Sequence, residues 1–198
     1  MVSSDVLSIN FNQFSKEYYH GTTSSNYASL MSGVSISKCA EFTDFGKGFY
    51  LTSNFRQASK HAEKRSSDKD DPIVFVYTLN ISVLKEEYQG NILNRMNLEW
   101  AEFIYNNRTM MKKFIHSYDY VQGGVADGAI FDLVQAVDQG LDIQHFYEQI
   151  AKYSTYNQLS IHNQDIFTYN VLKLSEVVNA FGKNEKYVQG EIIVPSEL

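Results

Sequence analysis

The sequence predicts one domain of the α+β class, and three observations carry this prediction. Residues 72–79 form an almost continuous apolar run of strand length. Residues 130–137 and 143–150 each place apolar side chains on one face of a helix. Residues 41–61 join a glycine-flanked aromatic strand to a capped helix. A chain of 198 residues can bury a sizeable core. No linker or repeat divides it, so we expect a single domain over residues 1–198.

The first expected elements lie near the start of the chain. A pair of tyrosines at residues 18–19 favours a strand, which we expect to end at His20, where side chains point into clefts. Residues 22–25 supply several candidate caps for a short helix, and Gly33 is typical of a helix end.

The stretch at residues 41–61 combines two glycines, a short strand and a helix. Gly46 and Gly48 allow a close approach of the backbone where a Cβ would clash. The aromatic residues 49–52 follow as a strand. Asn54 then caps a helix whose apolar face is formed by Phe55, Ala58 and Ala62.

The later pattern alternates strands and helices. The run at 72–79 is apolar on both faces, which is typical of an inner strand. Asn97 opens a helix, and residues 119–128 predict a short strand followed by a glycine-rich loop. Further strands are expected at residues 166–169 and 188–194.

Composition limits the functional classes. The net charge of −6 gives no global positive field toward nucleic acid or anionic membranes, although a local basic cluster could still bind them. Cys39 is the single cysteine, so no internal disulfide forms and we expect no metal site. No apolar run has the length of a signal peptide or a membrane span, so we expect a cytoplasmic protein without a membrane partner.

Two motifs taken together resemble a known group of enzymes. Residues 19–22 read Tyr-His-Gly-Thr, and residues 46–52 read Gly-Lys-Gly-Phe-Tyr-Leu-Thr. Alone, a histidine in a strand and an aromatic strand are both typical of ordinary packing. As an ordered pair they resemble the signatures of ADP-ribosyltransferases of the diphtheria-toxin and poly-ADP-ribose-polymerase group.

The resemblance is closer to a bacterial family of uncharacterised domains in the same clan. It covers residues 18–174 and implies two small, mainly antiparallel sheets around an NAD cleft, with helices outside. The shared runs are Asp44 to Thr52, Glu99-Trp100 with Asn107-Arg108, Tyr118-Asp119 with Gly124 to Asp127, and Asn163-Gln164 with Phe167-Thr168.

The resemblance also implies roles for individual residues toward NAD. His20 would hydrogen-bond the ribose on the adenosine side, and the main chain of Gly21 would hold the nicotinamide amide. Tyr50 would stack on the nicotinamide ring, and Thr52 would support the strand beside it. The remaining motif residues expected to contact NAD are Thr22, Gly48 and Phe49.

Two positions depart from the better-known relatives. His61 stands where those relatives have a second tyrosine, and it would form the other wall of the nicotinamide site. Gln164 is the best match to a catalytic glutamate that holds a ribose hydroxyl; it accepts a hydrogen bond but has no charge. Asp165 and Asp127 are the alternative carboxylates. A plainer interpretation is that Gln164 caps the turn before the strand at 166–169.

We therefore expect an enzyme that transfers ADP-ribose from NAD to a macromolecule, with Gln164, Tyr50 and His20 as its catalytic residues. The family suggests an intracellular toxin or defence effector that a protein antitoxin neutralises. Protein, RNA and DNA all remain open as acceptors. The alternative is a weak or inactive module that binds NAD or ADP-ribose, and a structural domain with coincidental motifs is a third interpretation.

Overall fold

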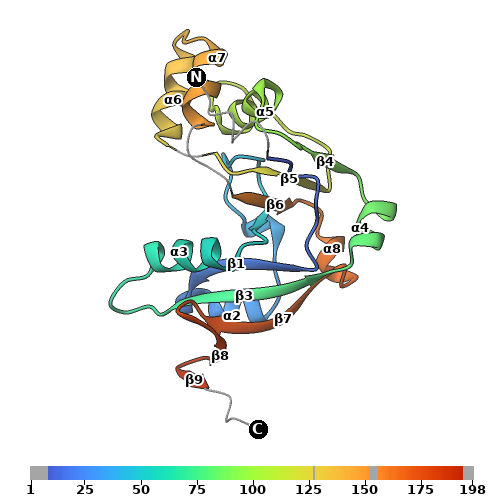
Figure 1. Ribbon diagram of the computed structural model, residues 1–198, viewed down its shortest axis with the longest axis vertical. Helices are drawn as coiled ribbons and strands as arrows, with labels where there is room; N and C mark the ends of the chain where they lie inside the picture. Colours follow the sequence, from blue (N-terminus) through green and yellow to red (C-terminus); the bar gives the residue numbers. More distant parts are fainter. Residues whose placement is uncertain (1–8, 127, 152–155, 194–198) are drawn as a thin grey trace. The chain divides into compact units, whose positions relative to one another are not determined.

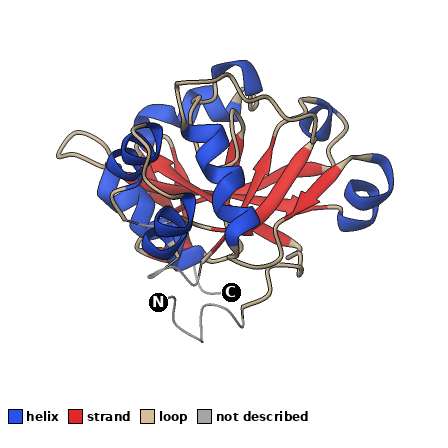
Figure 2. Ribbon diagram, turned by 90° about the horizontal axis from the view of Figure 1, so that it is seen from above, coloured by secondary structure: helices blue, strands red, loops and turns tan. Residues whose placement is uncertain are grey.

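The computed structural model describes residues 9–126, 128–151 and 156–193. Helices and strands are both present in this part of the chain, as Figure 2 shows in blue and red, and the strands form two sheets. The predicted α+β class is therefore confirmed. The chain divides into two compact units, each assembled from three segments. The first unit holds residues 1–13, 36–49 and 88–163, and the second holds 14–35, 50–87 and 164–198.

The second unit is built on a five-stranded antiparallel sheet in the order β1-β3-β7-β8-β9. Its strands are β1 (Glu17–Thr23), β3 (Pro72–Leu79), β7 (Leu172–Asn179), β8 (Gly182–Val188) and β9 (Glu191–Ile193). The residues of β3 from Ile73 to Tyr77 are at most 2% exposed. Because β1 and β7 flank it, β3 is the inner strand that its apolar run predicts (Figure 1).

Helix α3 (Phe55–Arg65) covers one face of this sheet beside β1 and β3 (Figure 1). Its N-cap is Asn54, whose side chain accepts a hydrogen bond from the Gln57 amide at 3.1 Å, as predicted. Ala58 and Ala62 are buried in a cluster with Tyr19. The small alanine side chains let the helix approach the strands closely.

The second unit also contains shorter helices. A 3₁₀ turn (Ser24–Asn26) leads into α2 (Tyr27–Met31), and α4 (Ile81–Glu87) follows β3. Gly33 has a φ of 116° after α2, which agrees with its predicted role as a helix end. The fourth, α8 (Asp165–Thr168), occupies the segment for which a strand was predicted.

Three details of the sequence prediction are wrong in this unit. His20 lies in the middle of β1 and not at its end. Residues 166–169 are mainly helical, and the left-handed φ of 57° at Asn170 ends that helix. The expected closing strand at 188–194 is instead the end of β8 and a separate β9, because Gly190 turns the chain with a φ of 88°. Val194 lies outside the described residues.

The other sheet has the order β2-β6-β5-β4. Its strands are β2 (Phe49–Leu51), β6 (Asn157–Ile161), β5 (Tyr120–Gly124) and β4 (Gly90–Ile92). Strand β5 pairs in antiparallel fashion with β6 and in parallel with β4. Gly123 and Gly124, expected in a loop, belong to β5.

Three helices of the first unit pack on one another: α5 (Leu98–Arg108), α6 (Ile130–Asp138) and α7 (Ile143–Ile150). The Asn97 side chain caps α5 by accepting from the Trp100 amide, as predicted. Trp100 is fully buried, and its Nε1–H donates to the Gly124 carbonyl at 3.0 Å. This bond fixes α5 to the end of β5. A 3₁₀ turn (Ile36–Lys38) completes the described elements of this unit.

Candidate functional site

The two motif strands meet at a single bridge. Tyr19 N–H donates to the Thr52 carbonyl at 2.8 Å, and Thr52 N–H donates back at 3.0 Å. The main-chain groups of Tyr19 therefore point away from β3. Because alternate residues of a strand direct these groups to the same side, those of Gly21 also point away from β3. No described residue hydrogen-bonds the Gly21 main chain on that side.

Gly21 has no room for a side chain. A Cβ built at this position would lie 1.9 Å from the carbonyl oxygen of Ala58 in α3. The sequence interpretation attributed this glycine to the approach of nicotinamide, but the packing of α3 is by itself sufficient to require it. The binding role of its main chain stays a prediction.

The His20 side chain is tied to the neighbouring motif. Its Nδ1 lies 2.8 Å from the Tyr50 carbonyl oxygen. A carbonyl can only accept, so Nδ1 carries the proton and Nε2 of the neutral ring is an acceptor. Burial lowers the pKa of His20 to about 4, and the charges of His61 and Arg65 add to the effect. At neutral pH this imidazole is uncharged.

Tyr50 and His61 were predicted to form the two walls of the nicotinamide site. Tyr50 is half-buried, whereas Phe49 and Leu51 on either side of it are buried. Since side chains alternate along a strand, Tyr50 faces away from the core side of β2. His61 is exposed on α3 and close enough to His20 to lower its pKa. Partial burial, together with Arg65 nearby, also lowers the pKa of His61.

The two motif threonines organise the chain that follows each strand. Thr22 Oγ1 accepts from the Asn26 side chain at 2.9 Å. Thr52 Oγ1 accepts from the Asn54 amide at 3.1 Å and donates to Gln57. Both threonines are buried. Their contacts agree with a supporting role and do not test direct contact with NAD.

Gly48 and Phe49, also expected to contact NAD, are packed in the first unit. A Cβ at Gly48 would lie 2.5 Å from Ser160 Oγ and 2.8 Å from the His162 ring. Phe49 is 5% exposed. The close approach that Gly48 permits is therefore to residues on and just after β6.

Gln164 lies at the N-cap of α8 and is exposed. Its side-chain Nε2 donates to the Val34 carbonyl at 2.9 Å. The plainer interpretation placed Gln164 in a turn before a strand, whereas this residue precedes a helix. Asp165 is exposed in α8, and Asp127 lies outside the described residues.

A second Asn-Gln pair does begin a strand. Asn157 and Gln158 are the first residues of β6, which is the neighbour of β2 in its sheet. The Gln158 side chain is buried, and its Nε2 donates to Asp44 Oδ2 at 2.8 Å and to the Gly124 carbonyl at 3.3 Å. Both partners are acceptors, so the amide orientation is fixed and Oε1 is directed elsewhere. Gln158 was not among the predicted site residues, and its Asn-Gln pair repeats the one at residues 163–164.

Asp44 is the centre of this buried polar cluster. Its side chain is 6% exposed, and Oδ1 accepts from Arg108 Nε at 2.7 Å. Oδ2 accepts from Gln158 and, at 3.4 Å, from the Ala126 amide. Arg108, Gln158 and the Ala126 amide thus all donate to the Asp44 carboxylate, although they come from separate segments of the chain. A buried carboxylate requires such partners because desolvation without them is costly.

These features define an α+β protein with two motif strands joined at one bridge and a buried Asp44 cluster. The chain belongs to the protein family described as protein of unknown function DUF3990, whose model matches residues 17–173. No curated protein and no solved structure matches the chain. Within the described residues, no cluster of histidine, cysteine, aspartate or glutamate side chains is arranged for a metal ion. The same residues include no helix with the length and apolarity to cross a membrane.

Proposed function

We propose that this protein transfers ADP-ribose from NAD to a macromolecular acceptor. The observation that carries the proposal is the edge of β1 at Gly21. There one N–H and one C=O point away from β3, beyond the bridge between Tyr19 and Thr52. The carboxamide of nicotinamide also pairs one donor direction with one acceptor, as a peptide group does. It can therefore bind this edge in the way that a strand residue would.

Two side chains support the same assignment. His20 is held by the Tyr50 carbonyl in a neutral form whose Nε2 accepts hydrogen bonds, which suits a ribose hydroxyl as its donor. Tyr50 has a half-buried ring, as expected for the wall of a binding site and not for the centre of a core. Stacking on such a ring contributes roughly 0.5–1.5 kcal/mol beyond the area it buries.

NAD would supply the ADP-ribosyl group: the bond from C1′ to nicotinamide breaks, nicotinamide leaves with the electron pair, and an acceptor oxygen or nitrogen bonds to C1′ and releases its proton. The protein's part is to bind and orient. Gly21 and Tyr50 would fix the leaving group, and His20 would fix the adenosine-side ribose. A polar acceptor atom is still needed for the ribose hydroxyl at the reacting end.

We propose Gln164 as the residue that supplies that atom. It belongs to the same unit as Gly21 and Tyr50, and its Nε2 donates to the Val34 carbonyl at 2.9 Å. This bond fixes the orientation of the amide, and the acceptor Oε1 is the atom proposed to hold the ribose hydroxyl.

The test is release of nicotinamide from labelled NAD, with and without cell lysate as a source of acceptor. Tyr50→Ala should weaken NAD binding about 2- to 12-fold, the equivalent of one stacking contact, and lower turnover. The matched control is Tyr169→Ala, which removes a tyrosine that is 70% exposed and belongs to no motif.

Thermal melting separates this account from simple packing. Truncation of a large core aromatic residue costs about 3–5 kcal/mol, and Tyr50→Ala should cost clearly less. A large loss of stability with unchanged NAD affinity would mean that Tyr50 is a packing residue. Wild-type protein that neither binds nor cleaves NAD would overturn the proposal. Binding without cleavage would favour the alternative of an inactive NAD-binding module.

A further inference from the structure

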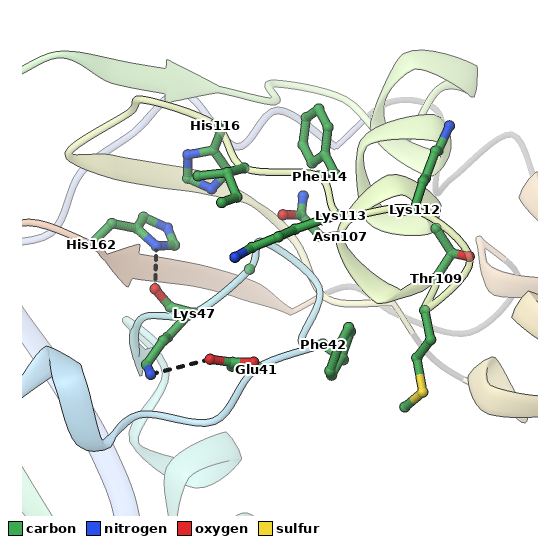
Figure 3. Close-up of a pocket in the computed structure, with 13 residues that line it drawn as sticks. Glu41, Phe42, Lys47, Asn107, Thr109, Lys112, Lys113, Phe114, His116 and His162 are labelled. Atoms are coloured by element: carbon green, nitrogen blue, oxygen red, sulfur yellow. Dashed lines mark hydrogen bonds and ion pairs between the residues drawn. The ribbon is translucent and has the colours of Figure 1, made fainter.

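The first unit contains a pocket that none of the predicted NAD-binding residues lines. Its volume is about 610 Å³, and it lies between residues 41–47, residues 107–116 and His162 (Figure 3). Sites for small ligands commonly measure roughly 300–1,000 Å³. The pocket is therefore large enough for one nucleotide or a group of similar size.

Two phenylalanine rings border the pocket and remain in contact with solvent. Phe42 is 43% exposed and Phe114 is 39% exposed. In Figure 3 the two rings lie on different sides of the Lys113 side chain. Phe114 is positioned by an edge-to-face contact with Phe103, with centroids 5.9 Å apart. The pocket thus offers flat apolar surfaces that no core residue covers.

The backbone at Phe42 is in an unusual conformation. Its φ of 56° is in the left-handed region, which a bulky side chain rarely adopts. Such strain persists only where surrounding structure enforces it, and it is concentrated at binding and catalytic sites. Here it accompanies a large aromatic side chain that is presented to the pocket and not buried.

The pocket is locally positive although the protein carries a net charge of −6. Three lysines line it against a single carboxylate, Glu41, which pairs with Lys47 at 3.3 Å. The Lys112 ammonium lies over the Tyr105 ring and points away from the pocket in Figure 3. The Lys113 ammonium extends toward the middle of the pocket. Lys113 is therefore the cation best placed to meet a ligand.

Two histidine rings also line the pocket, and each is held by a main-chain carbonyl. His116 donates from Nε2 to the Phe45 carbonyl at 2.7 Å and accepts at Nδ1 from the Tyr118 amide. His162 donates from Nδ1 to the Lys47 carbonyl at 2.9 Å. Burial lowers the pKa of His162 to about 4, so this ring is neutral at pH 7. The two rings meet edge to face at 4.6 Å.

We propose that this pocket binds a nucleotide unit of a single-stranded nucleic acid, with the base against Phe42 and a phosphate at Lys113. Cations beside exposed aromatic rings are the combination by which proteins hold single strands. An acidic peptide would use the lysine but would give no role to the strained Phe42 ring. The inference deepens the proposed function by naming nucleic acid as the acceptor of ADP-ribose. Only this acceptor role rests on the proposed function; binding of the strand does not.

The experiment measures binding alone, without NAD. Fluorescence anisotropy would follow labelled RNA and DNA single strands of about 12 nucleotides at low salt. Lys113→Ala should weaken binding and lower the dependence of log affinity on log salt by about one unit. Lys112→Ala changes the net charge equally and is the matched control, with a smaller effect expected.

The stacking contact is tested separately. Phe42→Ala should weaken binding about 5- to 150-fold, the range for loss of one stacked base. Phe131→Ala is its control, because Phe131 is 64% exposed on α6 and does not line the pocket. A preference for RNA or for DNA would identify the natural strand, and either result supports the inference.

Three results would overturn the inference. In the first, neither strand binds at low salt. In the second, the Lys113 and Phe42 variants bind as well as wild type. In the third, an acidic peptide binds in place of the strands and depends on Lys113. If the wild-type protein binds the strands but does not cleave NAD, the proposed function is refuted and the assignment of the pocket stands.

Discussion

At the scale of single residues, two histidines are held neutral by burial, and each donates to a main-chain carbonyl. His20 donates to Tyr50 and His162 donates to Lys47. Both have a pKa of about 4 in the folded protein, compared with 6.5 for an unperturbed histidine. Between pH 4 and pH 6.5 these two histidines bind more protons in the unfolded chain than in the folded protein. The free energy of unfolding must therefore fall as the pH is lowered from 6.5 to 4.

His162→Asn should remove its part of this pH dependence. The asparagine amide can still donate to the Lys47 carbonyl but does not titrate. For a shift of this size the wild-type loss from one such group is roughly 3 kcal/mol. Urea unfolding at pH 7.0 and at pH 4.5 should show a smaller difference in the variant. His116 and Asp119 also influence this ring, in opposite directions. Equal losses in the two proteins would show that His162 is not held neutral.

At the scale of elements, the proposed role of Gln164 is tested at the start of α8. Gln164→Ala should lower NAD turnover about a hundred- to a thousand-fold, as for loss of one preorganised polar group. Gln158→Ala, the matched change in the strand β6, should affect stability more than turnover. Kinetics with labelled NAD compares the two directly. Near-normal turnover by Gln164→Ala would overturn its assignment to the ribose hydroxyl.

The neighbours of Gln158 also explain why glutamine stands there. Glutamate would lose the donors to Asp44 and Gly124 and would place two carboxylates together. Gln158→Glu should therefore lower the melting temperature, and the double variant with Asp44→Asn should recover part of the loss. Calorimetry of both variants and of Asp44→Asn alone gives the coupling. Additive losses would mean that the two side chains do not interact.

The sequence was informative where one local rule was sufficient. Strand β3 could be predicted because its residues are apolar on both faces, and α3 because Asn54 caps an amphipathic repeat. Strand β6 could not, because it buries the polar Gln158 and Ser160, and the partner of Gln158 lies far away at Asp44. No local pattern distinguishes such a strand from a loop.

The site was predicted to a similar extent. The motifs assigned His20 and Tyr50 to one NAD site, and a hydrogen bond joins the two residues, while their roles toward NAD stay predictions. The glycines were less informative. A glycine in the sequence does not show whether a ligand or another part of the protein approaches it. At Gly21 the helix α3 makes the close approach. The Asp44 cluster could not be foreseen, since its members are joined only by tertiary structure.

At the scale of the whole molecule, the chain passes between its two units after residues 13, 35, 49, 87 and 163. Neither unit is therefore a continuous piece that could be cut away. A chain that ends at Asn163 should fail to fold, because it lacks β7 and leaves one edge of the buried strand β3 without its partner. A chain that ends at Val188 loses β9, whose residues are exposed, and should stay folded. Circular dichroism and solubility compare the two. A folded chain ending at Asn163 would contradict this account.

The shared carboxylate of Asp44 has a consequence for inheritance within the family. Arg108 and Gln158 come from distant parts of the chain, yet they donate to the two oxygens of one carboxylate. Replacing one of them alone would leave the buried Asp44 carboxylate with one donor fewer. The three positions should therefore be substituted together during evolution. Relatives with glutamate at the position of Gln158 should have lost the acid at the position of Asp44. An ancestor able to make that exchange would have passed through a neutral residue at the position of Asp44 first.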